Sequence, residues 1–207
     1  MKIIGITGGI GAGKSMILEI LKREYNAYVI ETDRLAQRLM EPGEELYDQL
    51  FHMFSDVLRS RGEESLIREQ LVMQNGEWNR PFLARLIFSD PEILRQMNAL
   101  VHPAVKAYIL SDIKNQAVPL YIIESAILIE DGYDRICDEL WYIYADTDTR
   151  INRLMNSRQY SYEKCLQIMN SQATEDYYRE HTLYTIDNSG DIDRVRDQIH
   201  LILNTNS

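Results

Sequence analysis

Residues 8–15 read Gly8-Gly9-Ile10-Gly11-Ala12-Gly13-Lys14-Ser15, a complete G-x-x-x-x-G-K-[ST] phosphate-binding pattern. Glycines in such a loop let several backbone N–H groups turn toward one anion, and the helix that follows adds its positive end. The lysine supplies a charge for the β- and γ-phosphates, and the serine supplies a hydroxyl for Mg²⁺. A plain glycine-rich turn would need no Lys-Ser at its end. The pattern therefore predicts that residues 8–15, with the adjoining Met16, bind a nucleoside triphosphate.

The sequence on either side agrees with such a loop. An apolar run, 3–7, precedes it and a helical pattern, 16–22, follows it, and this strand–loop–helix context separates a working site from a chance match. Strand-like runs occur at 2–7, 27–30, 119–123, 140–145 and 183–186, with helical patterns between them. The sequence thus predicts an α/β fold of the P-loop NTPase type, with a doubly wound parallel five-stranded sheet.

Composition and charge exclude several classes of protein. The 207 residues carry a formal net charge of −10, whereas a general nucleic-acid binder would show a basic surface. No signal peptide is apparent and no apolar run approaches about 18 residues, so neither a nucleic-acid nor a membrane partner is expected. Cys137 and Cys165 form neither a disulfide framework nor a metal motif. We expect a cytoplasmic protein that is a monomer or a small homo-oligomer.

The interval between the second and third strand-like runs is far longer than the 10–12 residues or so that a crossover needs. It contains several helical patterns, and Pro103 should begin or kink one of the helices. We expect a single domain in which 1–32 and 118–207 form the nucleotide-binding core and 33–117 a helical acceptor-binding insert. Ligands bind at the carboxyl edge of such sheets, where the insert would hold a phosphoryl acceptor.

The segment from about 146 to 172 is a local basic island in an acidic chain. It contains Arg150, Arg153, Arg158 and Lys164 and few acidic residues. One interpretation is a solvated helix face with salt-bridged arginines. The other is a mobile lid that closes arginines onto the transferred phosphoryl group. The phosphate loop upstream favours the lid.

Two acidic residues stand where strands end. Asp33 lies just past the second strand and Glu124 ends the third, and the ends of parallel strands converge on one edge. Asp33 is the candidate base for an acceptor hydroxyl, and Glu124 the candidate acid that organises Mg²⁺. Asp33 could equally cap the helix that follows it, and Glu124 could be an ordinary helix-start acid.

Further motifs follow the loop in a characteristic order, from residue 3 to about 190. They are Ile6–Ser15, Asp33 with Glu41-Pro42-Gly43, Asn79-Arg80, Val101-His102-Pro103, Arg153-Leu154-Met155 with Arg158, Gln172, and Ile186-Asp187-Asn188. In this order and content the chain resembles the dephospho-CoA kinase family of P-loop small-molecule kinases. The loop alone is shared by many families, whereas its combination with the downstream Glu-Pro-Gly and His-Pro is far more specific.

The resemblance implies that ATP, with Mg²⁺, phosphorylates the ribose 3′-hydroxyl of dephospho-CoA, which is the final step of coenzyme A synthesis. It also implies roles for individual residues. Asp33 would be the general base, Lys14 and Ser15 would serve the ATP phosphates and Mg²⁺, and Arg158 would be the lid arginine. Arg80 and His102 fall in the acceptor-binding region, although His102, next to a proline, also reads as a helix-packing histidine.

Four positions depart from the family pattern. Glu31 stands where the family usually has aspartate, Met16 where it has threonine, and Ala126 where it has proline. Arg158 follows Arg153 by one residue more than is common. The candidate base Asp33 is present nonetheless.

Two other functions remain open from the residues themselves. Another nucleoside or nucleotide kinase would release ADP with a different acceptor. An ATP-driven regulatory switch would hydrolyse ATP slowly and respond to a partner. A GTP switch is disfavoured, because the base-reading Asn-Lys-x-Asp does not occur, and we interpret Asp187-Asn188-Ser189-Gly190 as a strand end and turn.

Overall fold

The computed structural model describes residues 1–205. The chain forms two compact units, one made of Met1–Glu31 with the chain from Ala117 onward, and the other made of Thr32–Gln116. None of the helices in the described part is both long and apolar enough to cross a membrane.

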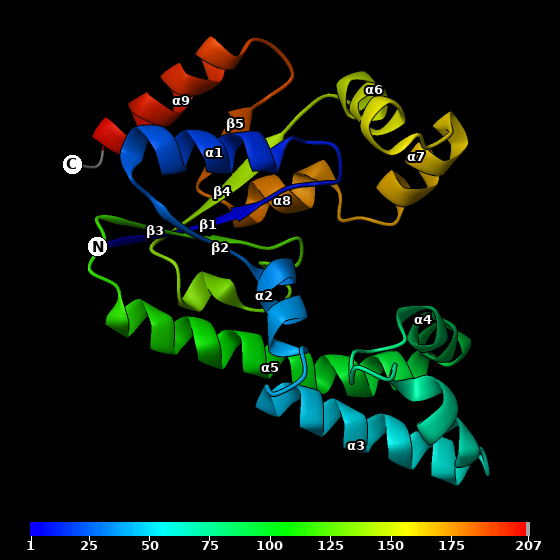
Figure 1. The fold of residues 1–207 in the computed structure, drawn as a ribbon. Helices are drawn as coiled ribbons and strands as arrows, with labels where there is room; N and C mark the ends of the chain where they lie inside the picture. Colours follow the sequence, from blue (N-terminus) through cyan, green and yellow to red (C-terminus); the bar gives the residue numbers. More distant parts are fainter. Residues whose placement is uncertain (206–207) are drawn as a thin grey trace. The chain divides into compact units, whose positions relative to one another are not determined.

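The first unit is built on a five-stranded parallel sheet with the order β2-β3-β1-β4-β5 (Figure 1). The strands are β1 (Lys2–Thr7), β2 (Tyr28–Glu31), β3 (Leu120–Glu124), β4 (Glu139–Tyr144) and β5 (Tyr184–Asp187). Each lies within about one residue of its predicted position. Because β1 is central and pairs with both β3 and β4, its carboxyl end opens directly into the glycine-rich loop.

Alternating side chains of the sheet face two different helical layers. Ile4, Ile6, Trp141 and Ile143 share one buried core with α1 (Lys14–Tyr25) and α9 (Ile192–Thr205), which cover the same face in Figure 1. On the opposite face α8 (Glu175–His181) packs against β4, and the Tyr142 and Tyr178 rings stack with centroids 4.8 Å apart. Helices on both faces are typical of a doubly wound sheet.

Two helices carry the basic island that the sequence predicted as a lid. These are α6 (Thr147–Arg158) and α7 (Tyr162–Asn170). The Asp146 carboxylate caps α6 by accepting from Thr149 N, and the Ser161 hydroxyl caps α7 by accepting from Lys164 N. The helices pack on a small apolar core of their own, made by Ile151, Leu154 and Cys165.

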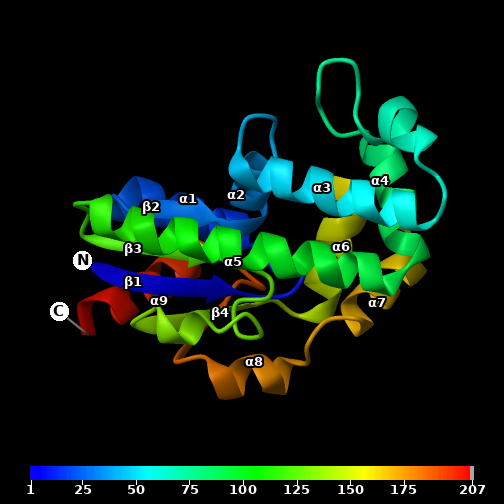
Figure 2. The same cartoon turned by 90° about the horizontal axis from the view of Figure 1, so that it is seen from below.

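The second unit is helical. Its elements are α2 (Thr32–Leu39), α3 (Glu45–Ser60), a π-helical turn η1 (Ile67–Leu71), α4 (Arg80–Ser89) and α5 (Pro91–Asn115). The long helix α5 packs against α2, α3 and α4, and Figure 2 shows it running beside α3. Pro103 lies inside α5 rather than at a helix start. Burial of Val101, Val105 and Ile109 on either side of the proline holds the helix together there.

Candidate active site

The glycine-rich loop joins β1 to α1 and has a backbone that side chains would obstruct. Gly11 and Gly13 have φ angles of +79° and +85°, a region that other residues rarely adopt. A Cβ on Gly11 would lie 2.9 Å from the backbone oxygen of Arg150, and one on Gly13 would collide with the Asn188 amide. Both glycines are therefore needed for conformation and for the close approach of neighbouring segments.

Lys14 and Glu124 meet at the carboxyl end of the central strands. Lys14 Nζ donates to the Gly8 carbonyl at 2.8 Å and lies 3.5 Å from Glu124 Oε1. Glu124 is brought there by the register of β3, in which it stands beside Ile6 of β1. Ser15 is exposed in the first turn of α1, whereas the neighbouring Met16 packs against the core. The structure thus brings three of the sequence-predicted residues, Lys14, Ser15 and Glu124, to one edge of the sheet.

The back of the loop is held by residues that follow β4 and β5. Arg153 Nη1 donates to the Ala12 carbonyl at 3.2 Å, and its Nη2 donates to the Asn188 carbonyl at 2.8 Å. Asn188 Nδ2 in turn donates to the Ala12 carbonyl at 2.7 Å. These bonds fix the Ala12 carbonyl, and with it the part of the loop that leads into α1.

The tip of the loop contacts the lid helices. The Ile10 carbonyl accepts from Arg150 Nε at 2.8 Å, and the Ile10 N–H donates to Gln172 Oε1 at 2.9 Å. Burial lowers the pKa of the Arg150 guanidinium, which nonetheless stays cationic at neutral pH.

Arg158, the lid arginine implied by the resemblance, is placed differently from Arg150 and Arg153. It is exposed at the last position of α6. In the described part of the chain, its guanidinium makes no hydrogen bond or ion pair.

Asp33 lies in the first turn of α2 and is exposed. Its carboxylate accepts no hydrogen bond within the helical unit, and as an acid in the first turn it is placed favourably for the dipole of α2. Glu31, two residues earlier, ends β2, and its Oε1 lies 3.9 Å from Lys22 Nζ of α1. The glutamate that stands where the family usually has aspartate therefore forms an ion pair within the first unit.

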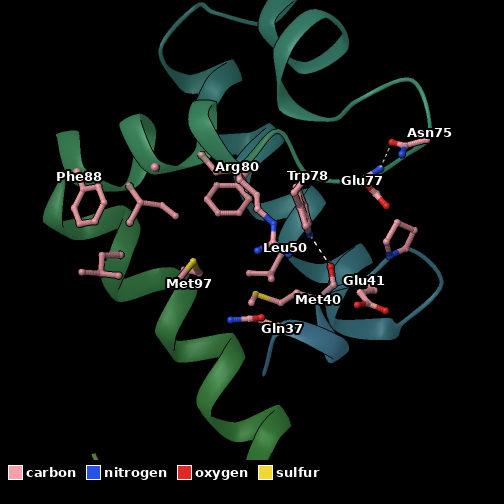
Figure 3. A pocket seen from close by; sticks show the side chains of 16 residues that line it. Gln37, Met40, Glu41, Leu50, Asn75, Glu77, Trp78, Arg80, Phe88 and Met97 are labelled. Carbon is pink, nitrogen blue, oxygen red and sulfur yellow. Dashed lines mark hydrogen bonds between the residues drawn. The ribbon is translucent and has the colours of Figure 1, made fainter. Parts of the chain in front are cut away.

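The helical unit contains a pocket of about 740 Å³. Its walls are mainly apolar and include Leu50, Trp78, Phe88 and Met97. Figure 3 shows Phe88 and Met97 toward one end, Glu41 and Glu77 toward the other, and Arg80 between them. Trp78 is fixed by a 2.7 Å hydrogen bond from its Nε1 to the Met40 carbonyl.

Two of the residues predicted to bind the acceptor, Arg80 and His102, therefore differ in position. Arg80, at the start of α4, lines the pocket. His102 lies partly buried in the middle of α5 and is not among the lining residues.

Sequence reasoning does not predict that the loop contacts Arg150, Arg153, Gln172 and Asn188. The two arginines belong to the basic segment of the predicted lid, and Gln172 and Asn188 belong to motifs of the family pattern. The position of Asn188 directly after β5 indicates that it lies near the loop, because parallel strands all end at the edge that carries the loop.

Comparison with known proteins decides between the functions that the residues left open. The family model for dephospho-CoA kinase matches residues 2–194. This chain belongs to the dephospho-CoA kinase family. The family, the enzyme class and the reaction predicted from the sequence, phosphorylation of dephospho-CoA to coenzyme A, are thereby confirmed.

Individual relatives match this chain over nearly its whole length. The dephospho-CoA kinase of Oceanobacillus iheyensis is 32% identical over 204 residues, which cover 97% of this chain and 96% of the relative. The crystal structure of TT1252 from Thermus thermophilus matches with a TM-score of 0.74 and 28% identity over 100% of this chain and 98% of that one. The dephospho-CoA kinase from Campylobacter jejuni, at 20% identity, shares the fold with a TM-score of 0.67 over 99% and 96% of the two chains. The predicted P-loop kinase fold is confirmed.

Proposed function

We propose that this kinase transfers the γ-phosphoryl group of ATP to the ribose 3′-hydroxyl of dephospho-CoA, with Mg²⁺ and with Asp33 as the base. The family match over residues 2–194 supports this reaction most strongly. The proposal assigns the triphosphate to residues 8–15, the acceptor to the helical unit, and the lid arginine's role to Arg158.

The donor side of the proposal rests on the loop and on Lys14. The loop presents backbone N–H groups at the start of α1, where the helix dipole favours an anion. Lys14 Nζ is held over the loop by the Gly8 carbonyl and by Glu124. A phosphate oxygen can replace the carbonyl as the partner of Nζ. The lysine then stabilises the charge that develops on the transferred group.

Ser15 and Glu124 fit Mg²⁺, which prefers oxygen ligands and often takes only one or two groups from the protein besides phosphate oxygens. The Ser15 hydroxyl is exposed beside Lys14, and the Glu124 carboxylate stands 3.5 Å from Lys14 Nζ at the same sheet edge. When bound, the ion would neutralise charge on the phosphates. Glu124 would also hold the lysine's ammonium group in place.

The role of Asp33 follows from its place in the chain. It comes two residues after Glu31, the last residue of β2, so the two Cα atoms are at most about 7 Å apart. Glu31 stands beside Glu124 in the β2–β3 register. An exposed carboxylate without a partner in its own unit is available to accept the proton of a hydroxyl that attacks the γ-phosphorus.

The pocket of the helical unit is suited to the non-reacting part of the acceptor. Dephospho-CoA joins an anionic diphosphate to a long, largely uncharged pantetheine arm. The Arg80 guanidinium lies among apolar walls that include Phe88 and Met97, so one pocket offers both a cation and an apolar surface. Binding energy gained far from the reacting hydroxyl helps to orient it for attack.

Replacement of Arg80 by glutamine is expected to raise KM for dephospho-CoA by about 10–100-fold, the effect of losing one or two charge-assisted bonds to a phosphate. KM for ATP should stay near its original value. Steady-state kinetics with each substrate varied in turn measures both. Arg85→Gln is the matched control, because Arg85 lies on the same helix and is exposed but does not line the pocket. Equal effects of the two substitutions would remove Arg80 from the acceptor site.

A panel of acceptors tests the function as a whole. ADP release is measured with ATP·Mg²⁺ and with dephospho-CoA, nucleosides, nucleotides or no acceptor. The proposal predicts rapid release with dephospho-CoA and slow release otherwise. Rapid release with a nucleoside or nucleotide and none with dephospho-CoA would refute it.

A further inference from the structure

One small cluster ties the tip of the phosphate loop to the lid helices. Gln172 Oε1 accepts two hydrogen bonds, from Ile10 N at 2.9 Å and from Arg150 Nη2 at 2.9 Å. Arg150 Nε donates a third bond, to the Ile10 carbonyl, at 2.8 Å. Both backbone groups of Ile10 are therefore bound by side chains that lie 140 and 162 residues further along the chain.

Apolar packing adds to these hydrogen bonds. The Ile10 side chain packs against the core that Ile151, Leu154 and Cys165 form between α6 and α7. A Cβ on Gly9 would collide with Arg150 Nη2, so the guanidinium lies directly on the loop backbone. The Ile10 side chain thus contacts α6 and α7, and its backbone contacts Arg150 of α6 and Gln172, which follows α7.

The remainder of the loop is held by other residues. Arg153 and Asn188 bind the Ala12 carbonyl, and Ala12 itself is buried in the main core. Within residues 1–205, Arg150 and Gln172 supply the side-chain hydrogen bonds to the backbone of Ile10. Removing that pair would leave the Ile10 backbone without these hydrogen bonds, while the base of the loop stays anchored.

We propose that Arg150 and Gln172 are positioning residues for the nucleotide. They act through Ile10, whose backbone they hold so that the loop keeps the shape that receives the triphosphate. Through these contacts the α6–α7 segment influences how tightly the nucleotide binds, in addition to the role proposed for Arg158 at the transferred phosphoryl group. This inference rests on the proposed ATP site at residues 8–15.

The proposal predicts a selective loss of nucleotide affinity. Arg150→Gln and Gln172→Leu each remove one hydrogen bond to the Ile10 backbone, together with the bond between the two side chains. Each should weaken binding of ATP·Mg²⁺ about tenfold. The double variant should be little weaker than either single variant, because the two side chains form one unit and their effects are not additive. KM for dephospho-CoA should not change.

Calorimetric titration of ATP·Mg²⁺ gives the Kd without turnover, and steady-state kinetics gives both KM values. The matched controls are Gln167→Leu on α7 and Arg194→Gln on α9, which replace exposed residues of the same types away from the loop. Gln172→Glu keeps an oxygen at the accepting position and should bind ATP more tightly than Gln172→Leu. Thermal melting of each variant shows whether a loss reflects unfolding.

Unchanged ATP affinity in both single variants would overturn the proposal, as would additive losses or an equal rise in both KM values. These outcomes differ from a failure of the proposed function. If the unaltered enzyme bound ATP but did not phosphorylate dephospho-CoA, the acceptor assignment would fail, while the Kd series would still decide the roles of Arg150 and Gln172.

Discussion

Replacement of Asp33 by asparagine is expected to lower kcat by about 10²–10⁴-fold, the usual contribution of a general base. The amide has nearly the shape of the carboxylate but cannot accept the hydroxyl proton. Asp33 is exposed in the first turn of α2 and accepts no hydrogen bond within its unit, so the substitution should disturb the fold little. ATP affinity should stay near that of the unaltered enzyme.

Single-turnover measurements with saturating ATP and dephospho-CoA give the rate of the chemical step for this variant. Asp48→Asn is a close control, because Asp48 is also an exposed acid in the first turn of a helix, α3. The control should retain full activity. Near-normal turnover in Asp33→Asn would remove Asp33 from the role of base.

Lys14→Met is expected to reduce kcat/KM by about 10²–10³-fold, comparable to the loss of one donor that stabilises charge in a transition state. The methionine is of similar length but carries no charge. Lys14 Nζ is held 2.8 Å from the Gly8 carbonyl and 3.5 Å from Glu124. Its charge is thus already oriented over the loop, and the substitution also leaves Glu124 without its ion-pair partner.

The same kinetic assay measures this variant, with Lys22→Met as its control. Lys22 lies on the same helix and forms ion pairs with Glu19 and Glu31. Its Nζ lies 3.4 Å from Glu19 Oε1 and 3.9 Å from Glu31 Oε1. Pairs of this kind near the surface contribute little to stability, so the control should be nearly fully active. A Lys14→Met enzyme within about threefold of the unaltered one would show that the lysine does not act on the phosphates.

The sheet and the loop could be predicted from the sequence because their signals are local. Runs such as Ile3–Ile6 and Tyr121–Ile123 are apolar on both faces, which is typical of strands covered by helices on either side. The loop pattern stands between a strand and a helix as its chemistry requires. The ends of parallel strands meet at one edge, which is why Glu124 could be expected near Lys14 from its place in the sequence.

Other features depend on contacts that no local pattern encodes. Gln172 accepts from Ile10, 162 residues away, and a glutamine after a surface helix carries no sign of such a partner. The last turns of α3 (Glu45–Ser60) place Ser55 and Leu58 in the buried part of the helical unit. The Asp33, Arg158, Arg80 and His102 roles remain predictions, as do the cytoplasmic location and the oligomeric state.

The position of the new phosphate on the product tests the central claim most directly. Dephospho-CoA and ATP·Mg²⁺ are incubated with the enzyme, and the product is analysed by mass spectrometry and by ³¹P NMR with proton coupling to the ribose. We expect one added phosphoryl group, on the ribose 3′-oxygen, with one ADP formed for each product molecule. A phosphate at another position, or ADP formed without a phosphorylated acceptor, would contradict the account.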